Sequence, residues 1–421
     1  MRHEQIDSWQ HFHSGRHEMC VRWLLNPDQQ PQQNCRLVIE DGILAAVQPT
    51  AAVDSSGPPL MLVPPLVNAH THLEFSTLSE PLQPAVPFTD WIRSVLRWRN
   101  ADRSKVGTDP LQAAVDAGLA ESAAQGVQLI GEIATSNPPQ PPSGPARCLI
   151  FREVIGLRPA RCEEQLTMLE SFLGLRREIE TAGGRIGISP HAPYTVHPEL
   201  LARLTGIARR ERLPLAMHLG ETREERVLLE QGTGLFAEFL RSLDLFDSAL
   251  FCGGRKFTDY LELLTLAPHA LAIHGNWFDR SEWEYLREHP TITVVYCPRT
   301  QRWFGHPPYP LEEMLATGVR VVLGTDSRAS NPDLGIWKEL QFVLQQHRSV
   351  DPLQVLSMIT TTAAAAMGWP EASQSLAPGR AFAGTLLECP AENSSLREQL
   401  QQSRILRAIP PPPHFKSNSE L

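Results

Sequence analysis

The chain has 421 residues, 42% of them hydrophobic and 20% charged, a composition that excludes disorder throughout and suits a globular protein with a sizeable core. Its 38 basic and 47 acidic side chains give a formal net charge of −9, which argues against nucleic acid as the main partner because an acidic chain repels phosphate backbones. Seven scattered cysteines without a Cys-x-x-Cys pair predict neither a disulfide framework nor a cysteine zinc site.

The polar start lacks the apolar segment of a signal peptide, and no run approaches about 18 apolar residues, so we expect a cytoplasmic protein without a membrane span.

Short strand-like runs fill the first part of the chain. Residues 36–40 and 43–47 flank the dipeptide Asp41-Gly42, which predicts a β-hairpin. Residues 48–59 are small and polar, with glycine and proline, and are typical of a loop.

From about residue 61, short apolar runs alternate with longer segments of helical periodicity. Near-continuous apolar strands separated by helices predict a parallel sheet covered on both faces, and eight repeats favour a closed (β/α)₈ TIM-type barrel. A doubly wound open sheet is the main alternative. The eight predicted strands are residues 61–67, 126–133, 148–154, 185–189, 214–218, 270–274, 292–297 and 319–324, and helices are predicted at 111–125, 162–182, 198–211, 281–289 and 310–317.

The chain continues beyond the eighth predicted strand. Two helices are expected at 334–347 and 351–367, followed by a β-like stretch at 381–387, and β-rich segments at both chain ends could pair into one small domain. The last residues, with four consecutive prolines, are typical of an extended or disordered tail. We therefore predict residues 1–62 and 369–408 as the two parts of a small β domain, 63–368 as the barrel and 409–421 as a flexible tail.

Polar residues recur where the predicted strands end. In an extended backbone His70 and His72 project to the same side, so both can reach one metal ion. Each residue alone has an ordinary structural explanation, such as a helix N-cap for Asp326. Together they predict a metal site, because the C-terminal ends of barrel strands meet on one face. The residues at these strand ends are His70, His72, His218, Glu221, His274 and Asp326.

Three imidazoles and a carboxylate, from His70, His72, His218 and Asp326, are a ligand set that suits one divalent metal ion, Zn²⁺ first, with Fe²⁺ and Mn²⁺ as alternatives. Such a metal makes a hydroxide nucleophile from bound water near neutral pH. His274 and Asp326 are then candidates to orient that water and accept its proton, and Glu221 is a candidate proton shuttle to the substrate.

The runs 68–73, 217–221, 274–275 and 324–327, in this order, resemble the amidohydrolase superfamily, in the branch of cytosine, guanine and adenosine-type aminohydrolases. The resemblance implies a (β/α)₈ barrel with a small β-sandwich domain built from both chain ends. It also implies that Glu221 and His274 are the acid–base pair. Binuclear members carry a carboxylated lysine on the fourth strand, and residues 185–190 contain no lysine, which favours a single metal.

The resemblance extends to possible substrate contacts. Residues 189–195 resemble a segment whose histidine, here His191, contacts the substrate, and residues 88–91 resemble one whose acidic residue, here Asp90, holds ribose hydroxyls. The run 72–76, which contains Glu74, is similar to aminodeoxyfutalosine deaminases. Arg152 and Glu153 end the third strand and are candidates to read a carboxylated or polar end of the substrate, and for Arg152 an ion pair at the barrel mouth is the alternative.

The expected activity is metal-dependent hydrolysis of a non-peptide C–N bond, with ammonia released from a small adenine nucleoside-like molecule such as aminodeoxyfutalosine. The same ligand set also serves hydrolysis of a cyclic amide, an amidine or a halogenated heterocycle. A third alternative is a barrel without catalytic activity, which the complete set of polar site residues disfavours. A homodimer is an open alternative to a monomer.

Overall fold

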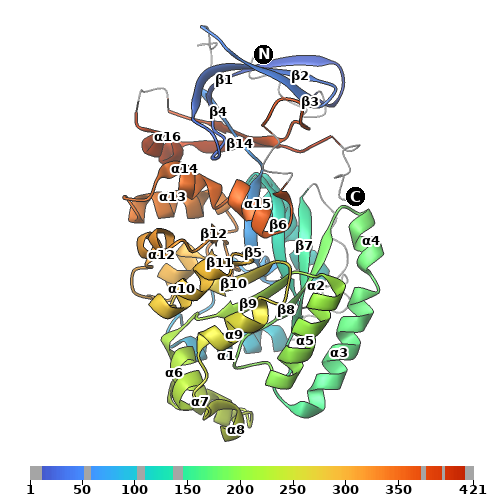
Figure 1. Cartoon of the computed structure of the whole chain (residues 1–421), viewed down its shortest axis with the longest axis vertical. Coiled ribbons are helices and arrows are strands. Elements are labelled where there is room, and N and C mark those ends of the chain that lie inside the picture. The colour runs from blue at the N-terminus through green and yellow to red at the C-terminus, as the bar shows by residue number, and fades with distance from the viewer. Residues whose placement is uncertain are drawn as a thin grey trace. The chain divides into compact units, whose positions relative to one another are not determined.

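The computed structural model describes residues 12–51, 58–101, 110–135, 146–370, 376–390 and 394–412 (Figure 1). Eight parallel strands form one sheet in which sequence neighbours are spatial neighbours, and this confirms the predicted (β/α)₈ fold over the open-sheet alternative. The strands are β5 (Leu66–Thr71), β6 (Val127–Ala134), β7 (Arg147–Val154), β8 (Arg185–Pro190), β9 (Leu215–Leu219), β10 (Ala270–His274), β11 (Ile292–Tyr296) and β12 (Val321–Leu323).

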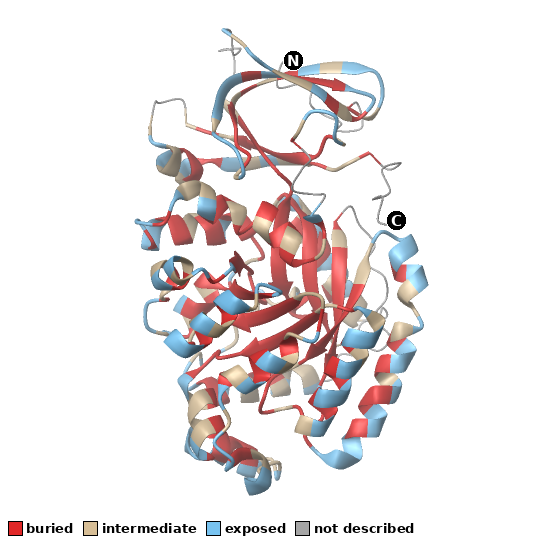
Figure 2. Cartoon of the chain, in the orientation of Figure 1, coloured by how far each residue is buried: buried red, intermediate tan, exposed pale blue. Residues whose placement is uncertain are grey.

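The two end strands of this sheet approach each other directly after β12. The backbone N–H of Asp326 donates to the carbonyl of His70 on β5 at 3.1 Å. This hydrogen bond links the segment after β12 to β5, the two edges between which the barrel closes. The strands are buried along most of their length, as Figure 2 shows in red. Burial on both faces explains why these strands appear in the sequence as continuous apolar runs.

The predicted first barrel strand, 61–67, is wrong in its position. Leu60–Val63 forms a separate strand, β4, in the other sheet, and the barrel strand β5 begins at Leu66. Pro64 and Pro65 lie between them. Proline has no N–H to donate to a ladder, so two consecutive prolines end one strand and allow the chain to enter the next sheet.

The connecting helices lie outside the strands (Figure 1). The predicted helix 162–182 is interrupted at Gly174 and Leu175, since glycine lowers helix stability by about 1 kcal/mol relative to alanine. The predicted helix 198–211 is confirmed, with His197 accepting a bond from the Glu199 N–H at its start. The helices are α1 (Phe88–Asn100), α2 (Pro110–Ala124), α3 (Pro159–Leu173), α4 (Arg176–Thr181), α5 (Pro198–Glu211), α6 (Arg223–Gln231), α7 (Gly234–Ser242), α8 (Ser248–Phe251), α9 (Phe257–Leu264), α10 (Arg280–Glu288), α11 (Pro298–Trp303) and α12 (Leu311–Thr317), with a short 3₁₀ helix, η3 (Leu73–Phe75).

Both ends of the chain build the second sheet. It has six strands in the order β14-β13-β4-β1-β2-β3, with β1 (Arg16–Leu24), β2 (Gln32–Glu40), β3 (Ile43–Pro49), β13 (Gly384–Glu388) and β14 (Arg404–Ile409). The predicted hairpin is confirmed as β2–β3, and its turn residues Asp41 and Gly42 both have positive φ, 48° and 79°. The start of β3 also bonds to residues 379–382, so the sheet curls over its own apolar core.

The chain divides into two compact units, residues 1–68 with 121–129 and 335–421, and residues 69–120 with 130–334. The first unit also holds the helices α13 (Ile336–Gln346), α14 (Pro352–Ser357), α15 (Thr361–Ala366) and α16 (Leu396–Gln402). Arg397 and Gln341 tie α16 and α13 together through hydrogen bonds to the carbonyls of Leu344 and Ser403. The domain boundaries at 62 and 368 stay predictions.

Ile409 ends β14 and is buried, so the flexible tail cannot begin there, and residues 413–421 of the predicted tail lie outside the described residues. None of the helices in the described part of the chain is both long and apolar enough to cross a membrane.

Candidate metal centre and active site

Three histidines form a cluster at the C-terminal ends of β5 and β9. His70 lies on β5, His72 follows that strand and His218 lies on β9, and all three are buried. One ring nitrogen from each lies within 4.8 Å of the others, and Nε2 of His72 is 3.2 Å from Nε2 of His218. The alternation of side chains along an extended backbone explains why His70 and His72 meet while Thr71 points elsewhere.

Asp326 brings a carboxylate to the same cluster from the segment after β12. Its Oδ1 lies 3.5 Å from Nε2 of His70 and 3.7 Å from Nε2 of His72, and its Oδ2 accepts a hydrogen bond of 2.7 Å from the Ser330 hydroxyl. Burial alone would raise the pKa of Asp326, but the surrounding histidines outweigh it and hold that pKa below its usual range. Asp326 is therefore an anion at neutral pH.

The nitrogen atoms of this cluster fit a divalent metal ion. Both ring nitrogens of His70 and Nδ1 of His72 are buried without a hydrogen-bond partner among the described residues. Nδ1 of His218 faces the carbonyl of His191 at 3.1 Å, so it carries the proton there and leaves Nε2 with a free lone pair. Burial lowers the pKa of His72 and of His218 well below the usual value, and the neutral imidazole is the form that binds metals.

A buried acid–base pair lies beside the cluster. Nε2 of His274, the last residue of β10, is 3.4 Å from Oε1 of Glu221, which follows β9. Burial raises the pKa of Glu221 well above its usual value, with the charges of Asp326 and Glu225 adding to the effect. Burial lowers the pKa of His274 to about 3. These shifts favour a protonated carboxyl beside a neutral imidazole, a pair that can donate and accept a proton at adjacent positions.

The backbone at His274 and Asp326 adopts an uncommon conformation. Their φ angles are 76° and 56°, in the left-handed region that non-glycine residues rarely occupy. The Tyr309 hydroxyl donates to the carbonyl of His274 at 3.0 Å, and the bond from the Asp326 N–H to His70 holds the second position. These contacts aim both side chains at the histidine cluster.

Two buried carboxylates that the sequence interpretation missed hold the site backbone. Glu132 on β6 accepts bonds from the Thr71 hydroxyl at 2.6 Å and from the Leu73 N–H at 3.0 Å, so it fixes the chain on both sides of His72. Glu225, in the first turn of α6, accepts a bond of 2.9 Å from the Glu221 N–H. The sequence signal for Glu132 is a single carboxylate within a mostly apolar strand.

Of the predicted substrate contacts, His191 and Glu74 lie next to the cluster. The ring centroids of His191 and His218 are 5.0 Å apart, and Nδ1 of His191 is 2.7 Å from the Thr195 hydroxyl. Glu74, on η3 directly after His72, is buried and bonds to Arg99 of α1 at 2.5 Å. Arg99 was not among the predicted site residues.

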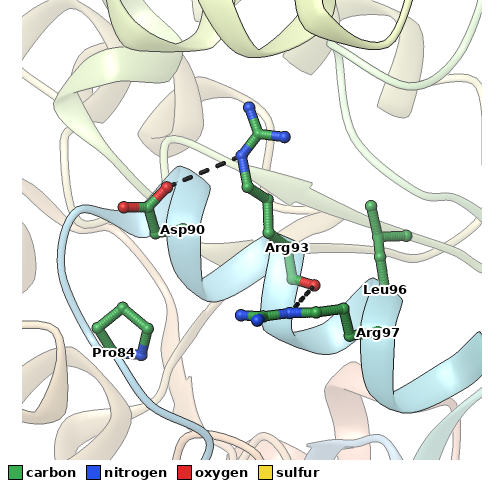
Figure 3. A pocket seen from close by; sticks show the side chains of 5 residues that line it. All are labelled: Pro84, Asp90, Arg93, Leu96 and Arg97. Carbon is green, nitrogen blue, oxygen red and sulfur yellow. Dashed lines mark hydrogen bonds and ion pairs between the residues drawn. The ribbon is translucent and has the colours of Figure 1, made fainter. Parts of the chain in front are cut away.

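The structure gives Asp90 and Arg152 other partners. Asp90 is exposed on α1, 3.8 Å from Arg93, and lines a surface pocket of about 490 Å³ together with Pro84, Leu96 and Arg97 (Figure 3). Arg152 is buried, and its Nη1 donates to the carbonyls of Ala134 at 3.2 Å and Thr135 at 2.8 Å, at the end of β6. The substrate roles predicted for these two residues have no support from these contacts.

Comparison with known proteins places this geometry in a family. Residues 61–399 match the Amidohydrolase family. A 5-methylthioadenosine/S-adenosylhomocysteine deaminase of Pyrococcus furiosus is 27% identical over 79% of this chain and 77% of its own length. An aminodeoxyfutalosine deaminase of Deinococcus radiodurans is 28% identical over 72% of each chain.

A solved structure supports the fold. The aminofutalosine deaminase of Helicobacter pylori, in complex with methylthio-coformycin, superposes with a TM-score of 0.74 at 18% identity, covering 93% of this chain and 98% of that one. The family match spans most of the chain and includes every residue of the cluster described above. The chain therefore belongs to the amidohydrolase family of metal-dependent hydrolases, which act on carbon–nitrogen bonds.

Proposed function

We propose that this protein is a mononuclear metal-dependent deaminase that hydrolyses the amino group of an adenine nucleoside-like substrate, such as aminodeoxyfutalosine, and releases ammonia. The observation that carries the proposal is the position of the Glu221–His274 pair, 3.4 Å apart, beside the cluster of three histidines. The deaminases of Pyrococcus furiosus and Deinococcus radiodurans, at 27% and 28% identity, support the same reaction class.

The proposed ligands of the metal are His70, His72, His218 and Asp326. The buried nitrogens of His70, which have no hydrogen-bond partner in the described part of the chain, and the neutral state of His72 and His218 support this assignment. When bound, a divalent ion, Zn²⁺ in this proposal with Fe²⁺ and Mn²⁺ as alternatives, acidifies a water molecule. Strand β8 carries no lysine that could bridge a second ion, and this favours a single metal.

Glu221 is the proposed proton donor to the substrate. Burial raises the pKa of its carboxyl and so favours the protonated form, which can pass its proton to a ring nitrogen and then carry a proton from the newly added hydroxyl to the leaving amine. His274, neutral and fixed by its left-handed backbone, accepts a proton from the attacking water at Nε2 and returns it to the Glu221 carboxylate, 3.4 Å away, once ammonia has left. The sum of these steps is substrate plus water giving the oxo product plus ammonia.

His191 and Glu74 are the proposed substrate contacts closest to the histidine cluster. His191 packs against His218, and its Nδ1 is held by Thr195, so Nε2 is the atom available to the substrate. Glu74 is fixed by Arg99. These two residues would bind and orient the part of the substrate that lies beside the reacting carbon.

Elemental analysis of the purified protein followed by an ammonia-release assay tests the proposal. The substrates are adenosine, S-adenosylhomocysteine, methylthioadenosine, aminodeoxyfutalosine, guanine and cytosine, with a cyclic amide and a chlorinated triazine as representatives of the other hydrolytic reactions. We expect about one metal ion per chain and turnover of an adenine nucleoside. Turnover of the cyclic amide or the triazine alone would contradict the proposed reaction.

A further inference from the structure

Glu153 on β7 is a buried carboxylate next to the proposed active site. Its side chain is 4% exposed, and its Oε1 lacks a hydrogen-bond partner among the described residues. Oε1 lies 3.8 Å from Nε2 of His191, too far for a hydrogen bond. An ionised or neutral carboxyl oxygen that is buried without a donor destabilises the protein, so a donor from a ligand would relieve that cost.

The direction of the Glu153 side chain follows from the alternation of side chains along β7. Successive side chains of a β-strand point to opposite faces, so the neighbouring Arg152 turns to the carbonyls at the end of β6 while Glu153 faces His191. Of the two charged residues at the end of β7, Glu153 is therefore the one whose side chain lies on the side of His191.

Arg99 lies between Glu74, to which it bonds, and Glu153, to which it makes a longer ion pair. Its Nη2 is 2.5 Å from Oε1 of Glu74 and 4.0 Å from Oε2 of Glu153, and its guanidinium lies over the ring of Phe75 at 5.4 Å. Oε2 of Glu153 is therefore directed at Arg99, whereas Oε1 is left for another donor. Nε of Arg99 is also buried without a partner among the residues that the structure describes.

The chemistry of Glu74, Arg99 and Glu153 favours a hydroxyl group as their ligand. Two carboxylates share one guanidinium, so an anionic group placed beside Glu153 would meet two like charges. An ammonium group has donors only, whereas a hydroxyl donates one proton and also accepts, and so can serve both the Glu153 oxygen and a donor such as Arg99.

We propose that Glu153 is a specificity-determining residue that accepts a hydrogen bond from a hydroxyl group of the substrate, with Arg99 and Glu74 positioning its carboxylate. The proposal rests on the function proposed above, since it concerns the substrate of the same site. It assigns to Glu153 the hydroxyl contact that the sequence pattern suggested for Asp90, which is exposed and paired with Arg93.

The test uses the metal-loaded full-length protein and hydroxyl-deleted substrates. For the best nucleoside of the assay above and its 2′-deoxy, 3′-deoxy and 5′-deoxy analogues, kcat and KM are measured for the wild type and for Glu153→Ala, Glu153→Gln and Asp90→Asn. Glu163→Gln is the matched control, because Glu163 is an exposed carboxylate of α3 that pairs with Arg203. Metal content and melting temperature are recorded for every variant.

We expect deletion of one particular hydroxyl to lower the wild-type kcat/KM about 10- to 100-fold, as for a hydrogen bond to a charged group. In Glu153→Ala, kcat/KM for the intact nucleoside should fall by about the same factor. Deletion of that hydroxyl should then lower kcat/KM of Glu153→Ala almost no further. The values for Glu153→Gln should lie between those of the wild type and Glu153→Ala. Asp90→Asn and Glu163→Gln should keep the wild-type discrimination.

Three results would overturn the proposal. In the first, Glu153→Ala retains the wild-type preference for the intact nucleoside. In the second, the preference is lost in Asp90→Asn instead. In the third, Glu153→Ala loses activity equally on all four substrates together with metal or thermal stability, as a purely structural role predicts. If the wild type deaminates no nucleoside while cleaving another substrate class, the proposed function fails, and the hydroxyl contact fails with it.

Discussion

The core of the six-stranded sheet and the C-terminal ends of the barrel strands are both buried, yet their chemistry is opposite. The core under β1–β4 consists of apolar side chains such as Leu37 and Phe382, which need no partners beyond packing contacts. The barrel end buries histidines and carboxylates, several of them with polar atoms that have no partner among the described residues. Burial of unsatisfied polar atoms costs stability, so the unpartnered nitrogens of His70 and His72, side by side at this end of the barrel, indicate a site built for a ligand.

Removal of a cluster histidine should have the largest effect. We expect His218→Ala to bind less than a tenth of the wild-type metal and to lose roughly 1,000-fold or more in kcat/KM, because it takes one of the proposed ligands. The measurements are elemental analysis and ammonia release. Full metal content and activity in His218→Ala would show that the buried histidines at the barrel end are not a metal site.

Glu221→Gln should lower kcat/KM by about 100- to 10,000-fold, since the amide can neither donate nor accept the proton that the carboxyl transfers. The metal content should remain at the wild-type level, because Glu221 is not among the proposed ligands. This variant separates proton transfer from metal binding. Wild-type turnover in Glu221→Gln would exclude it as the proton donor.

Glu132→Gln should weaken metal binding about 10- to 100-fold without changing the ligands, because Glu132 holds the backbone on both sides of His72. Competition with a chromogenic chelator measures the affinity. Glu178→Gln, an exposed carboxylate on α4, is the matched control and should bind metal as the wild type does. Equal metal affinities in Glu132→Gln and Glu178→Gln would show that the Glu132 carboxylate does not position His72.

Leu37→Ala should affect stability alone. Leu37 on β2 is fully buried in the apolar core, and its truncation should cost about 2–5 kcal/mol of the free energy of unfolding. Metal content and kcat of the folded fraction should stay within about twofold of wild type. Denaturant unfolding and elemental analysis are the measurements. Loss of metal from Leu37→Ala at low denaturant would show that metal binding depends on the apolar core of the six-stranded sheet.

The sequence predicts the elements well where burial imposes a pattern. Continuous apolar runs placed seven of the eight barrel strands within a few residues, because both faces of those strands are covered. The first strand was displaced, because its apolar run continues through Pro64 and Pro65, which separate two sheets. Similarly, helical periodicity does not reveal the break at Gly174, which lies inside an otherwise regular pattern.

The site was predictable where local spacing sets the geometry. His70 and His72 alternate along one strand, and His218, His274 and Asp326 end others, so strand order alone brings them together. The contacts of Arg99 and the opposite directions of Arg152 and Glu153 depend on how α1 and the strands pack, and residue spacing does not encode that. Asp90 was assigned from a resembling segment, and its side chain instead faces Arg93.

A metal titration of chelator-treated protein tests the central claim most directly. Ammonia release from the best adenine nucleoside is measured while Zn²⁺ is added in small steps to the metal-free chain. We expect activity to rise linearly and to reach its plateau at about one equivalent, with His218→Ala showing no rise. A plateau at two equivalents, or full activity before any metal is added, would contradict a single catalytic metal held by His70, His72, His218 and Asp326.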